Sequence, residues 1–305
     1  MVVIFFLVGE TMDNTKLKGS LAALSANIIF GFSFLFSKVA LGFAHPLIIL
    51  AVRFTVAFAV LNLLWLFRVV KLDLRGKPKG RIMLMALAQP LLYFILELYG
   101  IGSTSSAISG VIISLVPVAV IILSSIFLKE KPTLSQVLFS ALSLGAITAI
   151  SILSNDGASN KLIGIFLLLG AVICAAVFNI LSRSESSRYS PFERTYIMFL
   201  IGTVGFNIIA FVVLGGGYFT ELARASASPR FWGSIGYLSI VSSIAAFMLY
   251  NYSTSVISTV RSASFSNIIT VVSVLAGILI LKEVLSIPQL ICCLLIIVGV
   301  LGVNK

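Results

Sequence analysis

Residues 103–136 read STSSAISGVIISLVPVAVIILSSIFLKEKPTLSQ, and residues 262–289 read SASFSNIITVVSVLAGILILKEVLSIPQ. Both stretches begin with small and hydroxyl-bearing residues, continue as an apolar run and arrive at Leu-Lys-Glu. Each apolar run is close to the roughly 20 residues that a helix needs to cross the hydrocarbon core of a bilayer. The runs are continuous, whereas strands of a membrane barrel alternate apolar and polar residues, so the pattern predicts membrane helices.

The composition of the 305 residues agrees with a membrane protein. Hydrophobic residues make up 59% of the chain and charged residues 10%, whereas soluble domains carry roughly 25% charged residues. Such a chain cannot cover a globular surface with polar groups, which excludes a soluble enzyme, a disordered tail and a secreted disulfide scaffold. The three cysteines, Cys174, Cys292 and Cys293, lie in apolar stretches without CxxC spacing, so no disulfide framework or zinc site is expected.

Apolar runs between polar breaks predict an all-α integral membrane protein with ten transmembrane helices. The expected spans are Gly19–Leu41, Pro46–Phe67, Ile82–Ile101, Ser103–Leu128, Leu134–Ser154, Leu162–Leu181, Phe192–Leu214, Phe231–Ser253, Ile257–Leu281 and Ile287–Val303. Residues 1–16 form an N-terminal cytoplasmic segment, in which the short apolar run lacks the charged start of a signal peptide. Met12 is an alternative to Met1 as the start of the protein.

The distribution of Lys and Arg gives the orientation. Of the 21 basic residues, 15 lie on the side that holds both termini and the even-numbered connections, 5 lie on the other side, and Arg53 lies inside a span. Basic residues favour the cytoplasmic side, so both termini are expected in the cytoplasm. The basic stretch Arg68–Arg81 is accordingly interpreted as a topology determinant, and no nucleic-acid partner is expected.

The chain repeats itself in two registers. A shift of 145 residues places Gly19, Ala26, Ser37, Lys38 and Pro46 on Gly164, Ala171, Ser182, Arg183 and Pro191. A shift of 153 residues places Phe94, Tyr99, Leu128, Lys129, Glu130 and Gln136 on Phe247, Tyr252, Leu281, Lys282, Glu283 and Gln289. A longer connection at 215–229 absorbs the difference. Residues 17–154 and 162–303 are therefore expected to form two five-helix repeats of opposite orientation, a plan that places transport sites at the repeat interface.

These motifs resemble those of the EamA-type members of the drug/metabolite transporter superfamily. Residues 30–34, Phe-Gly-Phe-Ser-Phe, are similar to the family's Trp-Gly-x-x-Phe stretch, with Phe30 in place of the usual Trp. Residues 103–136 resemble its fourth span, and residues 262–289 repeat it with Ile269-Thr270 where the second repeat usually has Pro. That difference removes the sequence signal for a kink in the ninth span. The resemblance covers about residues 17–303 and implies ten helices in two inverted repeats, with export of small metabolites or amino acids common in the family.

Glu97 is the clearest candidate for a functional side chain. Gln89, Tyr93 and Glu97 are spaced i, i+4 and i+8 in the third span, so they are expected on one helix face. A carboxylate inside a membrane is costly and normally faces a cavity or a partner. Glu97 is therefore expected either to bind a cationic or amine group or to carry a coupled proton. The alternative is a structural ion pair or an interfacial carboxylate.

Arg53 is the expected partner of Glu97. It lies seven residues into the second span, roughly 10 Å deep, and Glu97 lies about 6 Å deep in the same outer half of the bilayer. The pair is interpreted either as a gate that opens when a solute or a proton competes for the carboxylate, or as a static lock between helices. A third interpretation lets the Arg53 guanidinium extend to the outer surface.

Tyr250 occupies the position in the second repeat that corresponds to Glu97. Ser242, Ala246 and Tyr250 make the matching i, i+4, i+8 face, so one half presents a carboxylate and the other a phenol to a shared cavity. This combination suits an amphipathic solute with an amine. Tyrosine is also common at membrane interfaces, which gives the alternative for Tyr250.

Three asparagines complete the candidates. Asn27 and Asn179 lie in the leading helices of the two repeats, which the family resemblance places beside a central cavity. Their amides are expected either to bind a zwitterionic or polyhydroxy solute or to hydrogen-bond between helices. Asn267 lies on a ridge of small residues in the ninth span, where a buried amide needs partners.

No signature of an enzyme or a nucleotide-driven pump is present in the sequence. HExxH, nucleophile-elbow and P-loop motifs are missing, so no cofactor, metal or catalytic activity is expected. The expectation is a secondary transporter of the inner membrane that exports small metabolites or amino acids by alternating access. The alternatives are a drug or nucleotide-sugar carrier and a lipid-linked sugar flippase. The expected partners are a small-molecule solute and the bilayer; proton coupling, and a monomer or a homodimer, stay open.

Overall fold

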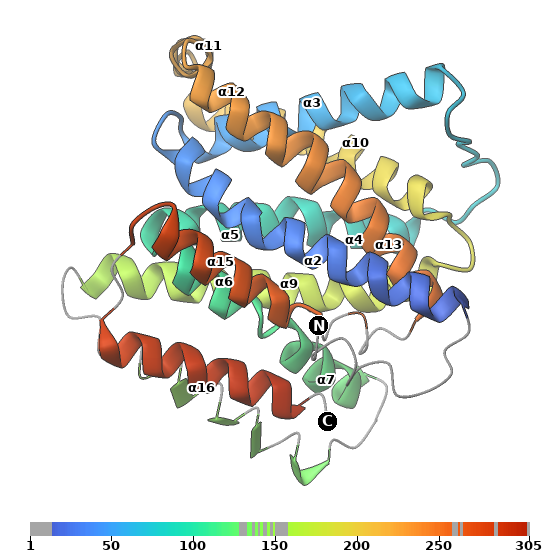
Figure 1. Cartoon of the computed structure of the whole chain (residues 1–305). Helices are drawn as coiled ribbons and strands as arrows, with labels where there is room; N and C mark the ends of the chain where they lie inside the picture. Colours follow the sequence, from blue (N-terminus) through green and yellow to red (C-terminus); the bar gives the residue numbers. More distant parts are fainter. Residues whose placement is uncertain are drawn as a thin grey trace.

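A computed structural model describes residues 14–127, 133–135, 138–139, 141–142, 145–146, 149, 158–257, 262, 265–283 and 286–303. Every regular element in these ranges is a helix (Figure 1). Met1 and Met12 lie outside the described residues, as do much of the expected fifth span and the Lys129-Glu130 pair.

The helices follow the order expected for two similar halves. In the first half they are α2 (Asn14–Leu41), α3 (Pro46–Leu66), α4 (Gly80–Ala86), η1 (Leu87–Leu92), α5 (Tyr93–Ser103), α6 (Ser106–Ile113) and α7 (Val116–Phe127). In the second half they are α9 (Ala158–Glu185), α10 (Pro191–Leu214), α11 (Gly217–Ser226), α12 (Pro229–Gly236), η2 (Tyr237–Ala246), α13 (Phe247–Val256), α15 (Asn267–Leu279) and α16 (Ile287–Val303). Residues 215–229, expected to be a connection, contain α11.

Local sequence explains where several helices begin. Pro46, Pro191 and Pro229 occupy the first turn of α3, α10 and α12, where a missing N–H removes no helical hydrogen bond. Ser190 and Glu193 form a capping box at the start of α10, because each side chain accepts from the other residue's backbone N–H.

Six helical segments are long and apolar enough to cross a membrane. They are Thr15–Leu41, Pro46–Leu66, Gly80–Ser103, Leu162–Glu185, Pro191–Leu214 and Pro229–Val256. Shorter apolar helices, Ile108–Leu123, Ile268–Leu279 and Leu290–Gly299, lie within the expected fourth, ninth and tenth spans. The structure therefore supports a multi-pass membrane protein.

The third span of each half contains an irregular π-helical segment at a matching place. η1 lies between α4 and α5, η2 lies between α12 and α13, and the shift of 153 residues places η1 within η2. Such wide helical turns are rare in proteins, and those that occur often lie at functional sites. In η1 the backbone of Gln89 leaves the helical region, with φ −145° and ψ 114°, because Pro90 disfavours the α conformation of the residue before it.

The fourth and ninth spans are both interrupted. α6 ends at Ile113 and α7 begins at Val116, and a turn at residues 265–266 precedes α15. The described part of the ninth span thus contains a turn before α15, without the proline that the family pattern carries in this span. The two interruptions meet, since the Ser266 hydroxyl donates to the backbone carbonyl of Ser114 at 3.4 Å.

The two halves interlock. The first helix of each half packs against the third span of the other, as α2 with α13 and α9 with α5, and α3 packs against α10 and α6 against α15. Glycines allow close approach at α5 and α9: a Cβ on Gly100 would lie 2.6 Å from the Leu168 Cγ, and one on Gly164 would lie 2.7 Å from the Thr104 Cγ2. Small residues at such crossings favour close helix packing in membranes.

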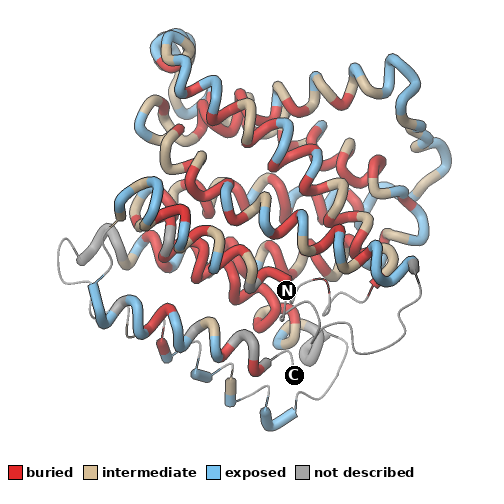
Figure 2. The backbone as a smooth tube through the Cα atoms, in the orientation of Figure 1, coloured by how far each residue is buried: buried red, intermediate tan, exposed pale blue. Residues whose placement is uncertain are grey.

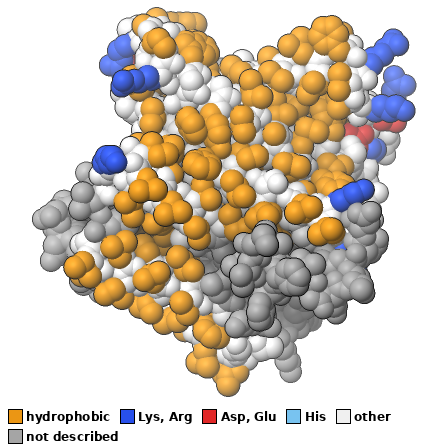
Figure 3. Space-filling view, in the orientation of Figure 1, with side chains coloured by type: hydrophobic (Ala, Val, Ile, Leu, Met, Phe, Trp, Pro, Cys, Tyr) orange, Lys and Arg blue, Asp and Glu red, His pale blue; other side chains and the backbone are white. Residues whose placement is uncertain are grey.

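Buried and exposed side chains are distributed as a membrane bundle requires. Buried residues concentrate between the helices, along the middle of the bundle (Figure 2). The face in Figure 3 shows an apolar band over the helices, and the charged side chains visible there gather toward the two ends of the helices. Large apolar side chains such as Phe166, Val212 and Leu294 are more than half exposed, as expected where lipid replaces water.

Candidate functional site

Two small cavities lie between the halves of the bundle. The first, here called the charged chamber, has a volume of about 40 Å³ and a lining that includes Arg53, Glu97 and Ser242. The second, here called the amide chamber, has a volume of about 50 Å³ and a lining that includes Asn27, Asn179 and Tyr250. Both chambers share walls made by Phe30, Gln89, Tyr93, Ile113, Phe247 and Ile269. Each has room for a few water molecules, since one water needs roughly 10–15 Å³.

Arg53 joins the two halves inside the charged chamber. Its side chain extends from α3 and is 3% exposed. The Nε atom donates to the Ser243 hydroxyl at 2.9 Å, and Nη2 donates to the Ser242 hydroxyl at 3.4 Å. The guanidinium also lies over the ring of Phe94, 4.3 Å from its centroid, which is a favourable cation–π arrangement. The guanidinium therefore stays in the interior and does not extend to the surface.

Glu97 lines the same chamber but does not form an ion pair with Arg53. Its carboxylate, on α5, accepts a hydrogen bond from the Tyr93 hydroxyl at 2.7 Å. The described ion pairs of the chain lie elsewhere, so the expected Arg53–Glu97 pair shares a chamber without direct contact in this conformation. Hydroxyl groups therefore hold both charges in place.

Gln89 reaches the chambers by a different route from the one expected. A regular helix from Gln89 to Glu97 was expected from the spacing, and the break at Gln89-Pro90 contradicts it. Gln89 nevertheless lines both chambers together with Tyr93. The irregular backbone of η1, and not a continuous helical stripe, places the Gln89 amide there.

The amide chamber brings together three of the other candidates. Asn27 and Asn179 each donate to the carbonyl four residues earlier, at Ala23 and Ala175. The Asn179 amide oxygen accepts from the Tyr250 hydroxyl at 2.5 Å. These hydrogen bonds fix the Asn179 amide across the interface of α9 and α13. Asn267 begins α15, and its side chain lies outside the described residues.

A symmetric pair of cations holds the ends of the third spans. The Lys38 ammonium, on α2, donates to the carbonyls of Ile101 and Thr104 at the end of α5. The Arg183 guanidinium, on α9, donates to the carbonyl of Thr254 near the end of α13 at 2.8 Å. A cation at a helix C-terminus satisfies orphan carbonyls and complements the helix dipole. The aligned residues Lys38 and Arg183 therefore make equivalent contacts in the two halves.

Arg194 lies near the start of the expected seventh span, and its side chain is fully buried in the first turns of α10. Its guanidinium donates to the carbonyls of Ser182 and Asn251 and to the hydroxyls of Ser182, Thr254 and Ser255. Arg194 thus fastens α10 to the ends of α9 and α13. The cluster of hydroxyl and amide residues at 251–255 was the sequence signal for such a partner.

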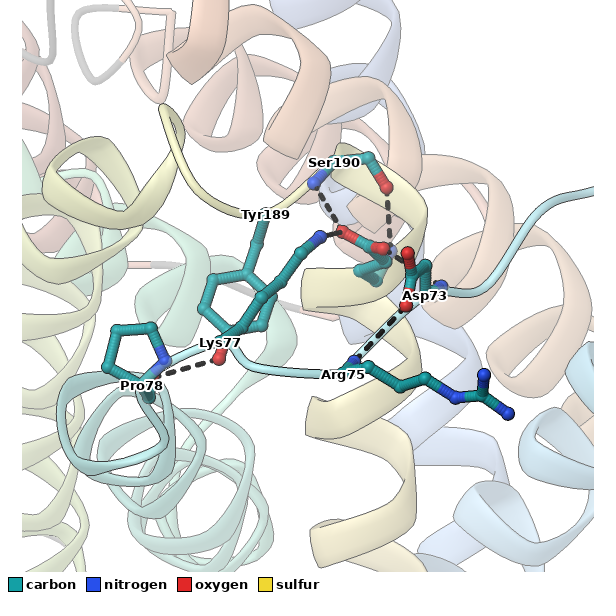
Figure 4. A network of polar contacts seen from close by, with 7 residues as sticks. Asp73, Arg75, Lys77, Pro78, Tyr189 and Ser190 are labelled. Atoms are coloured by element: carbon teal, nitrogen blue, oxygen red, sulfur yellow. Dashed lines mark hydrogen bonds and ion pairs between the residues drawn. The ribbon is translucent and has the colours of Figure 1, made fainter.

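The basic stretch between α3 and α4 is bound to the turn between α9 and α10. The Glu193 carboxylate accepts from the Lys77 ammonium at 2.6 Å and from the backbone N–H groups of Asp73 and Ser190. The Tyr189 hydroxyl donates to the Pro78 carbonyl at 2.9 Å. Figure 4 shows these side chains converging from both connections. The stretch therefore also ties the first half to the second, which the charge count alone did not indicate.

Several residues of the chambers were not identified from the sequence. Ser243 and Phe94 hold the Arg53 guanidinium, and Phe178 and Phe247 wall the amide chamber. The signal for the serines was the occurrence of three serines at 239, 242 and 243 within an otherwise apolar span. Within the described part of the chain, no group of three or more His, Cys, Asp or Glu side chains is placed to hold a metal ion.

Comparison with known proteins gives one consistent family. The model of the EamA-like transporter family matches residues 17–152 and 162–305. The chain is 36% identical to "Uncharacterized transporter YcxC" of Bacillus subtilis (strain 168) over 290 residues, covering 93% of this chain and 92% of that protein. It is 26% identical over 273 residues to an "Uncharacterized transporter" of Archaeoglobus fulgidus, covering 88% of this chain and 92% of that protein.

A solved structure described as "Crystal structure of protein" has a similar fold. Its TM-score is 0.67 at 16% sequence identity, over 94% of this chain and 97% of that one. At this identity the likeness concerns the fold alone.

Proposed function

The chain belongs to the EamA-like transporter family, and from this we propose that it exports small metabolites or amino acids by alternating access. That it is a multi-pass membrane transporter follows from the family and from its apolar helices. The exported solutes, the direction and the mechanism are the proposal. The driving force is a gradient, since the sequence carries no nucleotide-binding loop.

The observation that carries the proposal is the position of the two chambers. The amide chamber is lined by the first, third and fourth spans of both halves. The charged chamber is lined by the first four spans of the first half and by the third and fourth spans of the second half. A relative movement of the halves therefore changes both chambers. Inverted repeats that surround a polar site near the middle of the membrane are a recurrent plan of secondary transporters. Both chambers are far smaller than the roughly 300–1,000 Å³ of ordinary ligand pockets. A solute would therefore enter only after the halves have moved apart.

The proposed topology has ten helices in two inverted five-helix repeats, with both termini in the cytoplasm. The excess of Lys and Arg on one side supports this orientation. The equivalent contacts of Lys38 and Arg183 support the opposite insertion of the halves, because each lies near the end of its helix and α2 and α9 run in opposite directions (Figure 1). In a bacterial cell this arrangement corresponds to a protein of the inner membrane.

The test is the extracellular metabolite profile of cells that overproduce the native chain, compared with cells that produce Glu97→Gln at the same membrane level. The native chain is expected to raise the external concentration of one solute class. A loss of that rise in Glu97→Gln would assign the carboxylate to solute or proton binding. A rise with both chains would keep the export function and leave Glu97 a structural role.

Two further arms separate the competing functions. Cells with an empty vector set the baseline, and a native chain that does not exceed it would contradict export. Uptake of water-soluble solutes into everted vesicles and transbilayer movement of a lipid-linked sugar would then be measured in parallel. Transbilayer movement of the lipid without any solute flux would show that the protein is a flippase and not a solute carrier.

A further inference from the structure

The charged chamber contains one cation and one anion in a water-poor interior. Arg53 and Glu97 both line it, and each side chain is at most 5% exposed. A buried charge is stable only where it is paired or hydrogen-bonded. The two formal charges sum to zero, so a bound solute that leaves every charge compensated must itself carry one cation and one anion.

Each charged group keeps part of its hydrogen-bonding capacity. Among the described residues, the Glu97 carboxylate accepts one hydrogen bond, from Tyr93, although a carboxylate accepts up to about four. Arg53 donates from Nε and Nη2 to two serine hydroxyls, while a guanidinium has five N–H donors. Neutral hydroxyls hold both groups, and neither group is committed to an opposite charge.

The two charged groups lie close together without forming an ion pair. Both line one chamber of about 40 Å³, and the described ion pairs of the chain lie elsewhere. The guanidinium lies over the ring of Phe94, and Glu97 follows Phe94 by three residues on α5. A solute that carries an ammonium and a carboxylate on one carbon atom can therefore contact both groups, with one charge-assisted hydrogen bond to each.

We propose that the charged chamber is the head-group site for α-amino acids, in which Glu97 binds the ammonium and Arg53 binds the carboxylate, and that the amide chamber receives an uncharged side chain. This inference rests on the proposed transport function and specifies its substrate class. A simple amine would leave Arg53 without a counter-charge, and a simple carboxylate would leave Glu97 without one. Both analogues are therefore excluded by the unpaired charge that they would bury.

The lining of the amide chamber explains why the side chain of the bound amino acid is expected to be uncharged. Its walls are mainly aromatic and aliphatic, with Phe30, Phe178 and Phe247 among them. The polar residues of the lining are uncharged: Asn27, Gln89, Tyr93, Asn179, Tyr250 and Ser266. Among the residues that the structure describes, the lining contains no Asp, Glu, Lys, Arg or His. A charged side chain placed there would be desolvated without a partner, so aspartate, glutamate, lysine and arginine are expected to be rejected.

The experiment uses the purified full-length chain, with ligand-dependent thermal stabilisation for binding and counterflow in proteoliposomes for transport. The probes are leucine, phenylalanine and threonine, each with its decarboxylated amine and its deaminated acid, together with glutamate and lysine. At least one neutral amino acid is expected to bind and to be exchanged. Its amine, its acid and the two charged amino acids are expected to bind at least about tenfold more weakly.

Two variants are expected to change the analogue preference in opposite directions. Glu97→Gln leaves the Arg53 cation alone, so the deaminated acid should gain at least about tenfold relative to the amino acid. Arg53→Gln leaves the Glu97 anion alone, so the decarboxylated amine should gain by a similar factor. Glu221→Gln, on α11 and outside both chambers, is the control and should keep the native preference.

The native chain alone keeps the inference falsifiable if a variant does not fold. Equal affinity for an amino acid and its amine or acid would overturn it, as would binding of none of the three neutral amino acids. In either case the metabolite profile of the previous section still decides independently whether the chain exports another solute. A preference for amino acids that is unchanged in both variants would remove Arg53 and Glu97 from the site.

Discussion

At the level of single residues, hydroxyl groups keep charges inside this bundle. Arg53 is held by Ser242 and Ser243, and Glu97 is held by Tyr93. A hydroxyl can donate or accept by rotating its hydrogen, so it holds a charge without neutralising it. In this conformation the two chamber charges are thus held without an ion pair between them, which is what the proposed head-group site requires.

Removing the Tyr93 hydroxyl tests this arrangement. Tyr93→Phe deletes the one described donor to Glu97, and a hydrogen bond to a charged group contributes about 1.5–3 kcal/mol. We expect a normal membrane level and a transport rate lowered about tenfold or more. The initial export rate per molecule is the measurement. Tyr196→Phe removes a hydroxyl that donates to Asn62, away from the chambers, and an equal loss in this control would contradict the prediction.

Arg194 is expected to serve stability. Its guanidinium supplies five hydrogen bonds to groups on α9 and α13, and Arg194→Met would leave those acceptors buried without a donor. We expect the free energy of unfolding to fall on the order of 3 kcal/mol. Arg224→Met, at an exposed ion pair with Glu221, should change it by less than about 1 kcal/mol. Thermal unfolding in detergent compares the two, and similar transition temperatures would refute the assignment.

At the level of elements, the contact of α5 with α9 depends on the absence of side chains. A Cβ on Gly100 would lie 2.6 Å from the Leu168 Cγ and 3.2 Å from the Gly164 carbonyl oxygen. The equivalent crossing joins the first helix of the first half to the third span of the second half, where Gly19 of α2 contacts Val256 at the end of α13. The inverted repeat is therefore also a repeat of close helix crossings.

Substitution of two glycines by alanine is expected to affect stability differently. Gly100→Ala forces α5 and α9 apart and should destabilise the protein by about 1–3 kcal/mol. Gly233→Ala, where nothing lies within 4 Å of the added Cβ, should leave stability unchanged or raise it by about 0.5–1 kcal/mol. Unfolding temperatures of the two purified variants are the measurement. If both substitutions destabilised the protein, the loss would reflect a general intolerance of alanine at glycine positions and not the close crossing of α5 and α9.

The connection between α3 and α4 depends on Glu193. Glu193→Ala removes the acceptor for Lys77, for the Asp73 backbone and for the Ser190 backbone. We expect trypsin to cleave at 75–79 several times faster in the variant than in the native chain, because backbone release exposes the basic residues. Cleavage in everted vesicles, but not in right-side-out vesicles, would also support the proposed cytoplasmic location. An unchanged cleavage rate would show that other contacts hold this connection.

For the molecule as a whole, the main interfaces lie between the halves. α2 packs on α13 and α15, α9 packs on α5, and α3 packs on α10. A half on its own would leave these faces, with polar groups such as Ser182, Asn179 and Asn251, in contact with lipid. Unpaired polar groups in lipid are costly, so neither half is expected to keep its native structure alone.

Separate production of residues 1–155 and 156–305 tests this interdependence. We expect each half alone to be degraded, and the two halves produced together to accumulate and to copurify through a tag on one of them. Their membrane levels and copurification are the measurement. Stable accumulation of either half alone would show that the repeats fold independently, as separate domains do.

Most of the elements and candidates follow from sequence, with clear limits. Arg53, Gln89, Tyr93, Glu97, Asn27, Asn179 and Tyr250 all line one of the chambers, and their roles there stay predictions. The regular helical stripe through Gln89 was wrong, because Pro90 overrides the period of the helix locally. The burial of Arg194 and its partners were not predicted, because a position near a helix end does not reveal which neighbouring polar groups lie within reach.

The sequence by itself determines that this chain spans a membrane and that its halves are related, because run length, charge and repeat register are properties of the chain read in order. The tertiary structure decides which side chains share a chamber. Arg53 meets Ser243 across 190 residues of sequence, and Tyr250 meets Asn179 across the interface of α9 and α13. Hydropathy and helical period mark a polar residue as facing inward, but its partner depends on the packing of helices that are distant in the chain.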